Sequence, residues 1–98
     1  MAAAKEISRQ VSGLVESGST LIDLRETPQD DLRLTGKIDL SEKVLVLRAG
    51  QFIEFANGVN LAGSVVFLNG GDAAGLDSAK HCHIVRGLYP SGMLEFGI

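Results

Sequence analysis

The sequence predicts an α+β fold: an antiparallel β-sheet, made of a meander and a C-terminal hairpin, with one N-terminal helix packed on one face. Residues 43–68 contain three apolar runs separated by short glycine-containing turns, which is the pattern of a meander. Residues 2–17 carry apolar side chains at spacings of three and four, which predicts an amphipathic helix. Residues 81–89 and 93–98 are separated by a Pro-Ser-Gly turn and predict the final hairpin.

The two turns of the meander predict its register. Asn57-Gly58 is a strong signal for a two-residue hairpin, because both turn positions need φ > 0 and these residues tolerate it. Ala49-Gly50 is a weaker signal of the same kind. Both faces of the resulting sheet are apolar, so the sheet needs two covers. We expect the helix to cover one face and a second copy of the chain to cover the other, with the C-terminal hairpin as the alternative cover for the second face.

The face left for the second copy defines a predicted interface. Monomeric soluble proteins rarely leave a large contiguous apolar patch open to water, and a twofold dimer is the commonest way to cover one. Polar side chains around the patch would form the rim of the interface and are candidates for ligand binding. The predicted interface residues are Val44, Val46, Ile53 and Phe55, and the candidate ligand-binding residues are Arg48, Gln51, Asn60 and Ser64.

The remaining segments fit the same scheme. Residues 21–24 predict a short strand, and residues 32–40 alternate between apolar and polar side chains, as a strand with one wet face does. Residues 69–80 form a Gly-, Ala-, Asp- and Ser-containing loop, long enough to be either mobile or functional. An alternative fold is a short parallel β-helix, in which runs ending near glycines stack as rungs. These glycines are Gly36, Gly50, Gly58, Gly63 and Gly70.

Length and charge limit the protein class. The 98 residues predict a single domain, residues 1–98, with one modest core. A net charge of −3 without a basic cluster argues against nucleic-acid binding. One cysteine, Cys82, cannot form an internal disulfide, and no signal peptide or membrane-spanning run is evident. We therefore expect a cytoplasmic protein without a membrane partner.

No motif specifies a reaction, a cofactor or a known family. His81 and His83 share a face of the predicted strand, so both imidazoles can reach one divalent ion, but zinc needs at least three protein ligands. The leading hypothesis is a non-enzymatic, homo-oligomeric module that binds a protein or small-molecule partner through the sheet face and the subunit boundary, without a cofactor. The alternative is a small enzyme or metal-dependent ligand binder that uses His81, His83 and the 69–80 loop.

Overall fold

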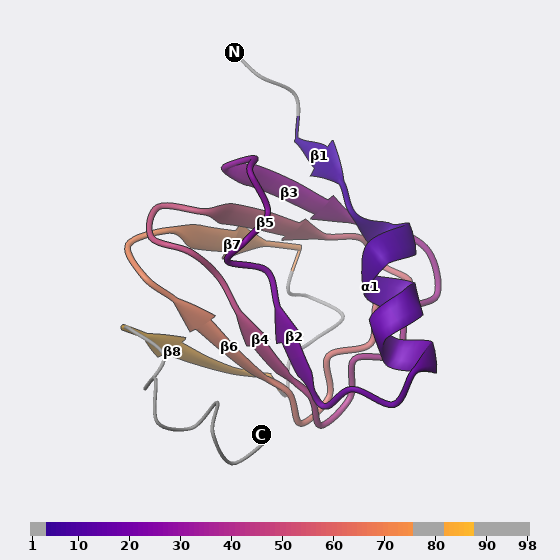
Figure 1. The fold of residues 1–98 in the computed structure, drawn as a ribbon. Helices are drawn as coiled ribbons and strands as arrows, with labels where there is room; N and C mark the ends of the chain where they lie inside the picture. The colour runs from indigo at the N-terminus through magenta and orange to yellow at the C-terminus, as the bar shows by residue number, and fades with distance from the viewer. Residues whose placement is uncertain (1–3, 76–81, 88–98) are drawn as a thin grey trace.

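The computed structural model describes residues 4–75 and 82–87. These residues form one helix and eight strands, which alternate between two four-stranded sheets (Figure 1). Sheet A contains β1 (Lys5–Glu6), β3 (Asp31–Leu34), β5 (Phe52–Phe55) and β7 (Asp72–Ala74). Sheet B contains β2 (Leu21–Asp23), β4 (Val44–Val46), β6 (Val65–Leu68) and β8 (His83–Arg86), and the helix α1 spans Ser8–Glu16.

Every strand pair is parallel, and each strand pairs with the strand one turn of the chain away. Asp31 pairs with Phe52, and Val44 pairs with Val65, in each case 21 residues later. A chain that returns to the same sheet after each circuit and pairs with itself in parallel is a solenoid. The fold is therefore a short parallel β-helix.

The coil has a third side, formed by residues 35–43 and 56–64, where a parallel bridge joins Asp39 and Asn60. Alternate side chains of all three sides point into the coil and stack on their equivalents in the next turn. These stacked side chains form one core, in which every side chain is at most 5% exposed. They include Leu32, Leu34, Ile53 and Phe55 from sheet A, Ile22, Leu45, Val66 and Leu68 from sheet B with Leu24 and Leu47 directly after its strands, and Ile38, Leu40, Val59 and Leu61 from the third side.

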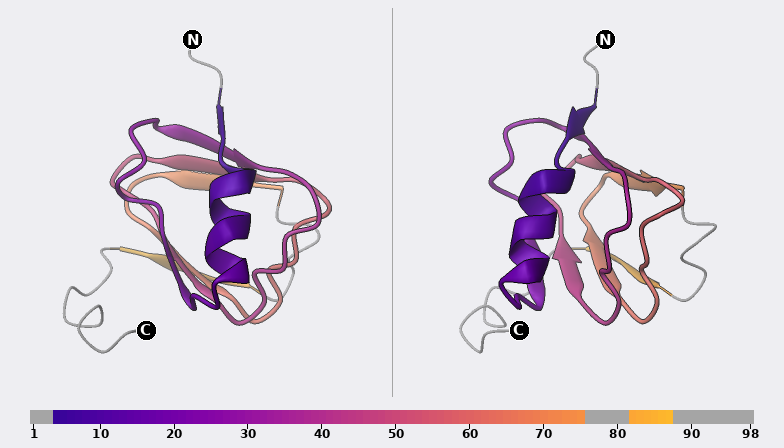
Figure 2. Two further views of the ribbon diagram at one scale, coloured as in Figure 1. Left: turned by 45° about the vertical axis from the view of Figure 1, so that its right-hand side comes forward. Right: turned by 90° about the vertical axis from the view of Figure 1, so that its right-hand side faces the viewer.

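Helix α1 takes the place of the third side in the first turn of the coil and lies across its end (Figure 2). Its Val11 and the preceding residue Ile7 are buried in the core, and Leu14 and Val15 pack against it. Solenoid ends need such caps, because the last turn otherwise exposes the apolar interior. The predicted helix of residues 2–17 is thus present but shorter, and it covers the end of a coil rather than the face of a sheet.

The predicted antiparallel meander is wrong, since strands that follow each other in the chain belong to different sheets. Neither Asn57 nor Gly58 has the positive φ that a type I′ hairpin turn requires. Glycine is needed at position 58 for another reason: a Cβ there would lie 2.5 Å from the carbonyl oxygen of Gly36 in the adjacent turn. The Asn-Gly pair therefore marks a stacked corner, and the short parallel β-helix is the arrangement that the structure supports.

Three further predictions change with the fold. The alternating run of residues 32–40 is not one strand, because β3 ends at Leu34 and the chain turns at Gly36 (φ 89°) onto the third side. The 69–80 loop contains strand β7, while residues 76–80 lie outside the described part. The first strand of the predicted C-terminal hairpin contains β8, which pairs in parallel with β6, and residues 88–98 lie outside the described part. Among the described residues, no helix has the length and apolar character needed to span a membrane.

Candidate interaction surface

The outward side of sheet B is apolar. Alternation along β4 and β6 sends Leu45 and Val66 into the core and places their neighbours on the outer surface. Val46 is only 1% exposed, yet it does not belong to the core cluster. We define the sheet B face as the outward apolar residues of this sheet: Leu21, Val44, Val46, Val65, Phe67 and Val85.

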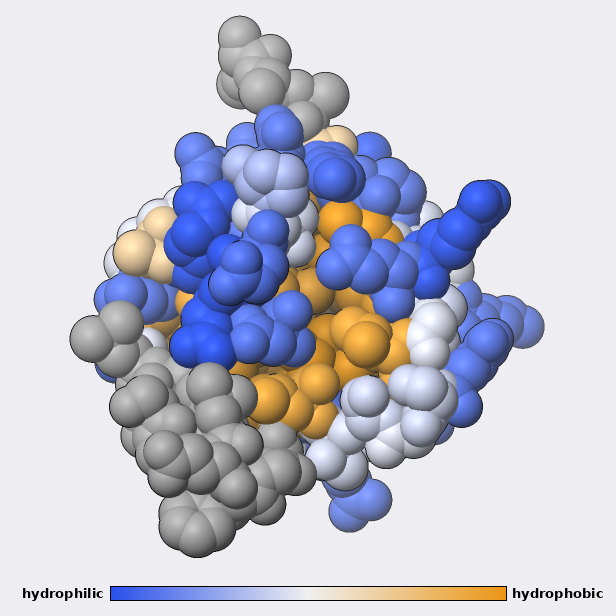
Figure 3. Space-filling view, viewed as in Figure 1, coloured by the Kyte–Doolittle hydropathy of each residue, from blue (hydrophilic) through white to orange (hydrophobic). Residues whose placement is uncertain are grey.

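The outward side chains of sheet B, including these six, lie in two rows that run across the four strands. One row runs from Leu21 through Val44 and Val65 to His83, and the other from Asp23 through Val46 and Phe67 to Val85. All the apolar members except Val46 are half-buried, so they still offer surface to a partner. Figure 3 shows hydrophobic surface in the centre of the view, where β2 and β4 lie next to α1.

Polar and charged side chains lie at the border of the sheet B face. Asp23 at the edge of the sheet accepts two hydrogen bonds from the Arg25 guanidinium, at 2.9 and 2.7 Å. These bonds hold the pKa of Asp23 below its usual range, although partial burial opposes them. The opposite end of the first row is His83, which is exposed. The surface therefore has an apolar centre with polar groups at its edge.

The structure does not bring the four predicted interface residues together. Val44 and Val46 lie on the outward side of sheet B, where Val44 is half-buried and Val46 is 1% exposed, so only Val44 offers surface to a partner. Ile53 and Phe55 lie in the core on the sheet A side, at 0% and 2% exposure. The antiparallel register placed them on one face with Val44 and Val46, whereas in the parallel coil β5 belongs to the other sheet. Ile53 and Phe55 are therefore inaccessible to a second copy.

Two of the candidate ligand-binding residues meet at a corner of the coil. The backbone N–H of Arg48 donates to Oε1 of the buried Gln51 at 2.7 Å. The amide of Gln51 donates to the carbonyl oxygens of Leu24 and Gln29, both at 3.2 Å. The Arg48 guanidinium donates to Asp30 Oδ1 at 2.8 Å. The polar groups at this corner form hydrogen bonds with one another and with residues 24–30. The corner therefore holds the 24–30 segment in place and does not form a pocket.

The other two candidate ligand-binding residues lie on the third side. Ser64 is buried, and its hydroxyl donates to the carbonyl oxygen of Leu61 at 2.7 Å. Asn60 is exposed, and its amide donates to Asp39 Oδ1 at 3.3 Å. The four predicted residues therefore do not line one common site.

The proposed metal pair falls only partly within the described residues. His83 is exposed at the start of β8, and His81 lies outside the described part. Within residues 4–75 and 82–87, no group of three His, Cys, Asp or Glu side chains is arranged to hold a metal ion. The Cys82 thiol is half-buried, and this burial raises its pKa, which lowers its thiolate fraction.

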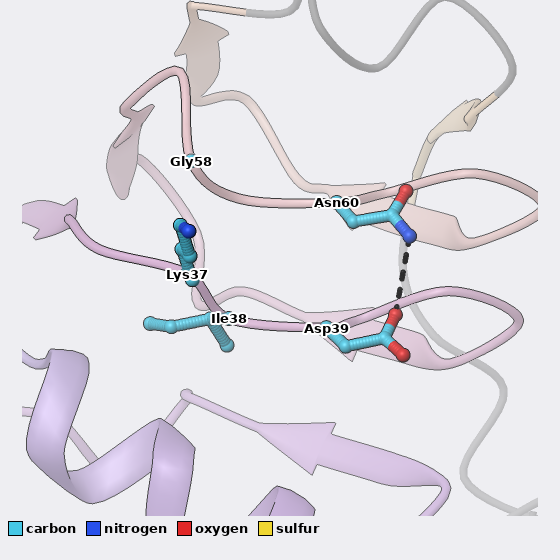
Figure 4. Close-up of a pocket in the computed structure, with 5 residues that line it drawn as sticks. All are labelled: Lys37, Ile38, Asp39, Gly58 and Asn60. Carbon is cyan, nitrogen blue, oxygen red and sulfur yellow. Dashed lines mark hydrogen bonds between the residues drawn. The ribbon is translucent and has the colours of Figure 1, made fainter.

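A hollow of about 340 Å³ opens on the third side, lined by Lys37, Ile38, Asp39, Gly58 and Asn60 (Figure 4). The Ser41 hydroxyl donates to Asp39 Oδ1 at 2.6 Å and is the main cause that lowers the pKa of Asp39. The lining of the hollow is mainly apolar, and the Asn60 amide donates to the Asp39 carboxylate beside it. It combines one cation, one carboxylate and one amide, the kind of set that orients a polar ligand on an apolar floor.

The sequence-based prediction missed four members of the sheet B face: Leu21, Val65, Phe67 and Val85. The signal that identifies Val65 and Phe67 is a 21-residue spacing, since they follow Val44 and Val46 by that distance in the register of β4 and β6. The same spacing relates Leu40 to Leu61. A search for equal spacing between apolar pairs, rather than between glycines, would have revealed the repeat.

The chain matches no family model, and neither a curated protein nor a solved structure shows a significant match to it.

Proposed function

We propose that this protein is a non-enzymatic interaction module that forms a homodimer through the sheet B face. The observation that carries the proposal is the pair of outward apolar rows on this sheet, with the half-buried side chains of Val44, Val65 and Phe67 at their centre. An outer sheet face in contact with water normally carries polar side chains, and large apolar patches usually mark interaction sites.

A second copy is the partner that fits this surface best. The centre of the face carries no charge, so two identical faces can meet without like-charge repulsion. Rows of β-branched side chains form a flat surface, which suits the face-to-face packing of two sheets. The Asp23–Arg25 ion pair and His83 would form the polar rim that surrounds such an apolar contact. The dimer would present two copies of every remaining surface to a further partner.

A matched pair of substitutions tests the proposal. Phe67 and Phe52 are both half-buried, outward-facing phenylalanines, one on sheet B and the other on sheet A. Phe67→Asp would place an unpaired charge in the dimer contact, which is costly once water is excluded. Light scattering over a concentration series should give a monomer for Phe67→Asp and a dimer for wild type and Phe52→Asp.

Circular dichroism of each variant shows whether the β-helix is retained. If folded Phe67→Asp protein remains dimeric, the sheet B face is not the contact. Dissociation by Phe52→Asp alone would assign the contact to sheet A instead.

A further inference from the structure

The third side of the coil has an open backbone edge next to helix α1. In the bridge between the two turns, the N–H of Asn60 donates to the carbonyl oxygen of Ile38 at 2.9 Å. The carbonyl oxygen of Asn60 accepts a hydrogen bond from the N–H of Leu40 at 2.8 Å. This parallel pattern uses the residues on either side of Asp39, so the N–H and carbonyl of Asp39 itself point away from Asn60.

No strand of a preceding turn pairs with this edge among the described residues; helix α1 lies on that side of the coil, across a cavity from the edge. Within the described residues, neither the N–H nor the carbonyl oxygen of Asp39 has a backbone hydrogen-bond partner. Between the helix and the edge lies a cavity of about 210 Å³, lined by Ser12, Val15, Glu16, Lys37, Ile38 and Asp39. This cavity adjoins the hollow of Figure 4, because both are lined by residues 37–39.

We propose that this groove binds an extended, basic peptide segment of a partner protein, which adds a strand beside Asp39 between the edge and helix α1. Strand addition supplies main-chain hydrogen bonds from any extended peptide, and side-chain pockets select its sequence. The N–H and carbonyl of Asp39, for which residues 4–75 and 82–87 supply no backbone partner, are the two groups that such a strand would satisfy.

The charges around the groove select the peptide. Glu16 and Asp39 contribute two carboxylates to the groove lining, against the single ammonium group of Lys37. Oδ2 of Asp39 accepts no hydrogen bond among the described residues, because Ser41 and Asn60 both donate to Oδ1. A lysine or arginine in the peptide would therefore meet an uncommitted carboxylate oxygen. Val15 and Ile38 supply the apolar floor for a neighbouring aliphatic side chain.

This groove lies on the third side of the coil and shares no residue with the sheet B face. The two surfaces can therefore be tested separately, and peptide binding does not depend on dimer formation. A homodimer would offer two such grooves, which raises the avidity for a partner with repeated basic segments.

The test is an NMR titration of ¹⁵N-labelled full-length protein with a blocked five-residue peptide of threonine, valine, lysine, valine and threonine. The backbone amide of Asp39 and those of its neighbours Lys37 and Ser41 should show the largest shift changes. The same peptide N-methylated at both valines loses the strand hydrogen bonds and should not bind. A peptide with glutamate in place of lysine should bind several-fold more weakly.

The matched variant is Asp39→Asn. An asparagine fits this position, because Asn60 occupies the equivalent position in the next turn of the coil, where its side-chain oxygen accepts a hydrogen bond from the N–H of Ala62 at 3.1 Å. This variant should weaken binding by about threefold to fivefold, as expected for one solvent-accessible charge pair. Glu54→Gln, on the outer side of sheet A, should leave binding unchanged. Shift changes centred away from residues 37–41 would overturn the proposal. So would equal binding of the N-methylated peptide, or no binding at millimolar peptide.

Discussion

The outer faces of the two sheets differ in character although their inner faces are alike. Sheet A points Arg33 and Glu54 outward on adjacent strands, where they form an ion pair at 3.2 Å. The equivalent positions of sheet B hold valines and Phe67. In both sheets the inward side chains stack in the core, so the two sheets differ only in their outward side chains, which lie outside the core. Folding therefore constrains the inner rows, and the proposed dimer would account for the apolar outer rows of sheet B.

The largest effect is expected when a charge is placed on an inner row instead of an outer row. Phe55→Asp would bury a charge in the core and remove a large apolar side chain, at a cost of at least about 4 kcal/mol. We expect this variant to unfold, whereas Phe52→Asp, three residues earlier and outward-facing, should stay folded. Circular dichroism with urea titration measures both. A folded Phe55→Asp protein that is merely monomeric would instead place Phe55 on a surface.

A smaller effect is expected from the ion pair between Asp23 and Arg25, which is less exposed than the pair between Arg33 and Glu54. The Asp23 and Arg25 side chains are each 33% exposed, against 49% and 42% for Arg33 and Glu54. The pKa of Asp23 is lowered in the folded protein, mainly by the Arg25 hydrogen bonds, so the pair stabilises the fold above the pKa of an unfolded aspartate. That contribution is lost as the pH falls through the lower, folded pKa.

Asp23→Asn should therefore reduce the loss of stability on acidification, and Arg25→Gln should do the same because it removes the partner of Asp23. Urea unfolding of wild type and both variants, from neutral pH to below pH 3, gives the comparison. An unchanged pH dependence in both variants would show that the pair contributes no measurable stability.

The sequence predicted the apolar runs and the amphipathic helix, but not how the runs pair. The continuous apolar run Val44–Val46 predicts a strand that is apolar on both sides. It carries no information on which strand lies beside it or in which direction that strand runs. The pair Asn57-Gly58 then favoured a hairpin, because the same residues serve a type I′ turn and a stacked corner. The 21-residue spacing between Val44 and Val65 was the evidence that separates the two arrangements.

The candidate surfaces depend on the strand pairing, which the sequence-based prediction assigned wrongly. Val44 and Val46 were predicted as interface residues because a strand that is apolar on both sides needs a second cover, and the structure places both on the outward side of sheet B. Ile53 and Phe55 were misplaced because a face can be assigned only once the sheet of each strand is known. The groove beside Asp39 left no local signal, since it arises where a helix replaces a strand that the rest of the coil would predict.

The most direct measurement of the central claim is a search for contacts between subunits in a sample of mixed labelling. Equal amounts of ¹³C-labelled and unlabelled protein are combined, and isotope-filtered NOE spectra detect only contacts between copies. We predict intermolecular NOEs among the methyl groups of Val44 and Val65 and the ring of Phe67, and none to Phe52 on sheet A. Spectra without intermolecular NOEs at high micromolar concentration, or with NOEs confined to sheet A, would contradict self-association through the sheet B face.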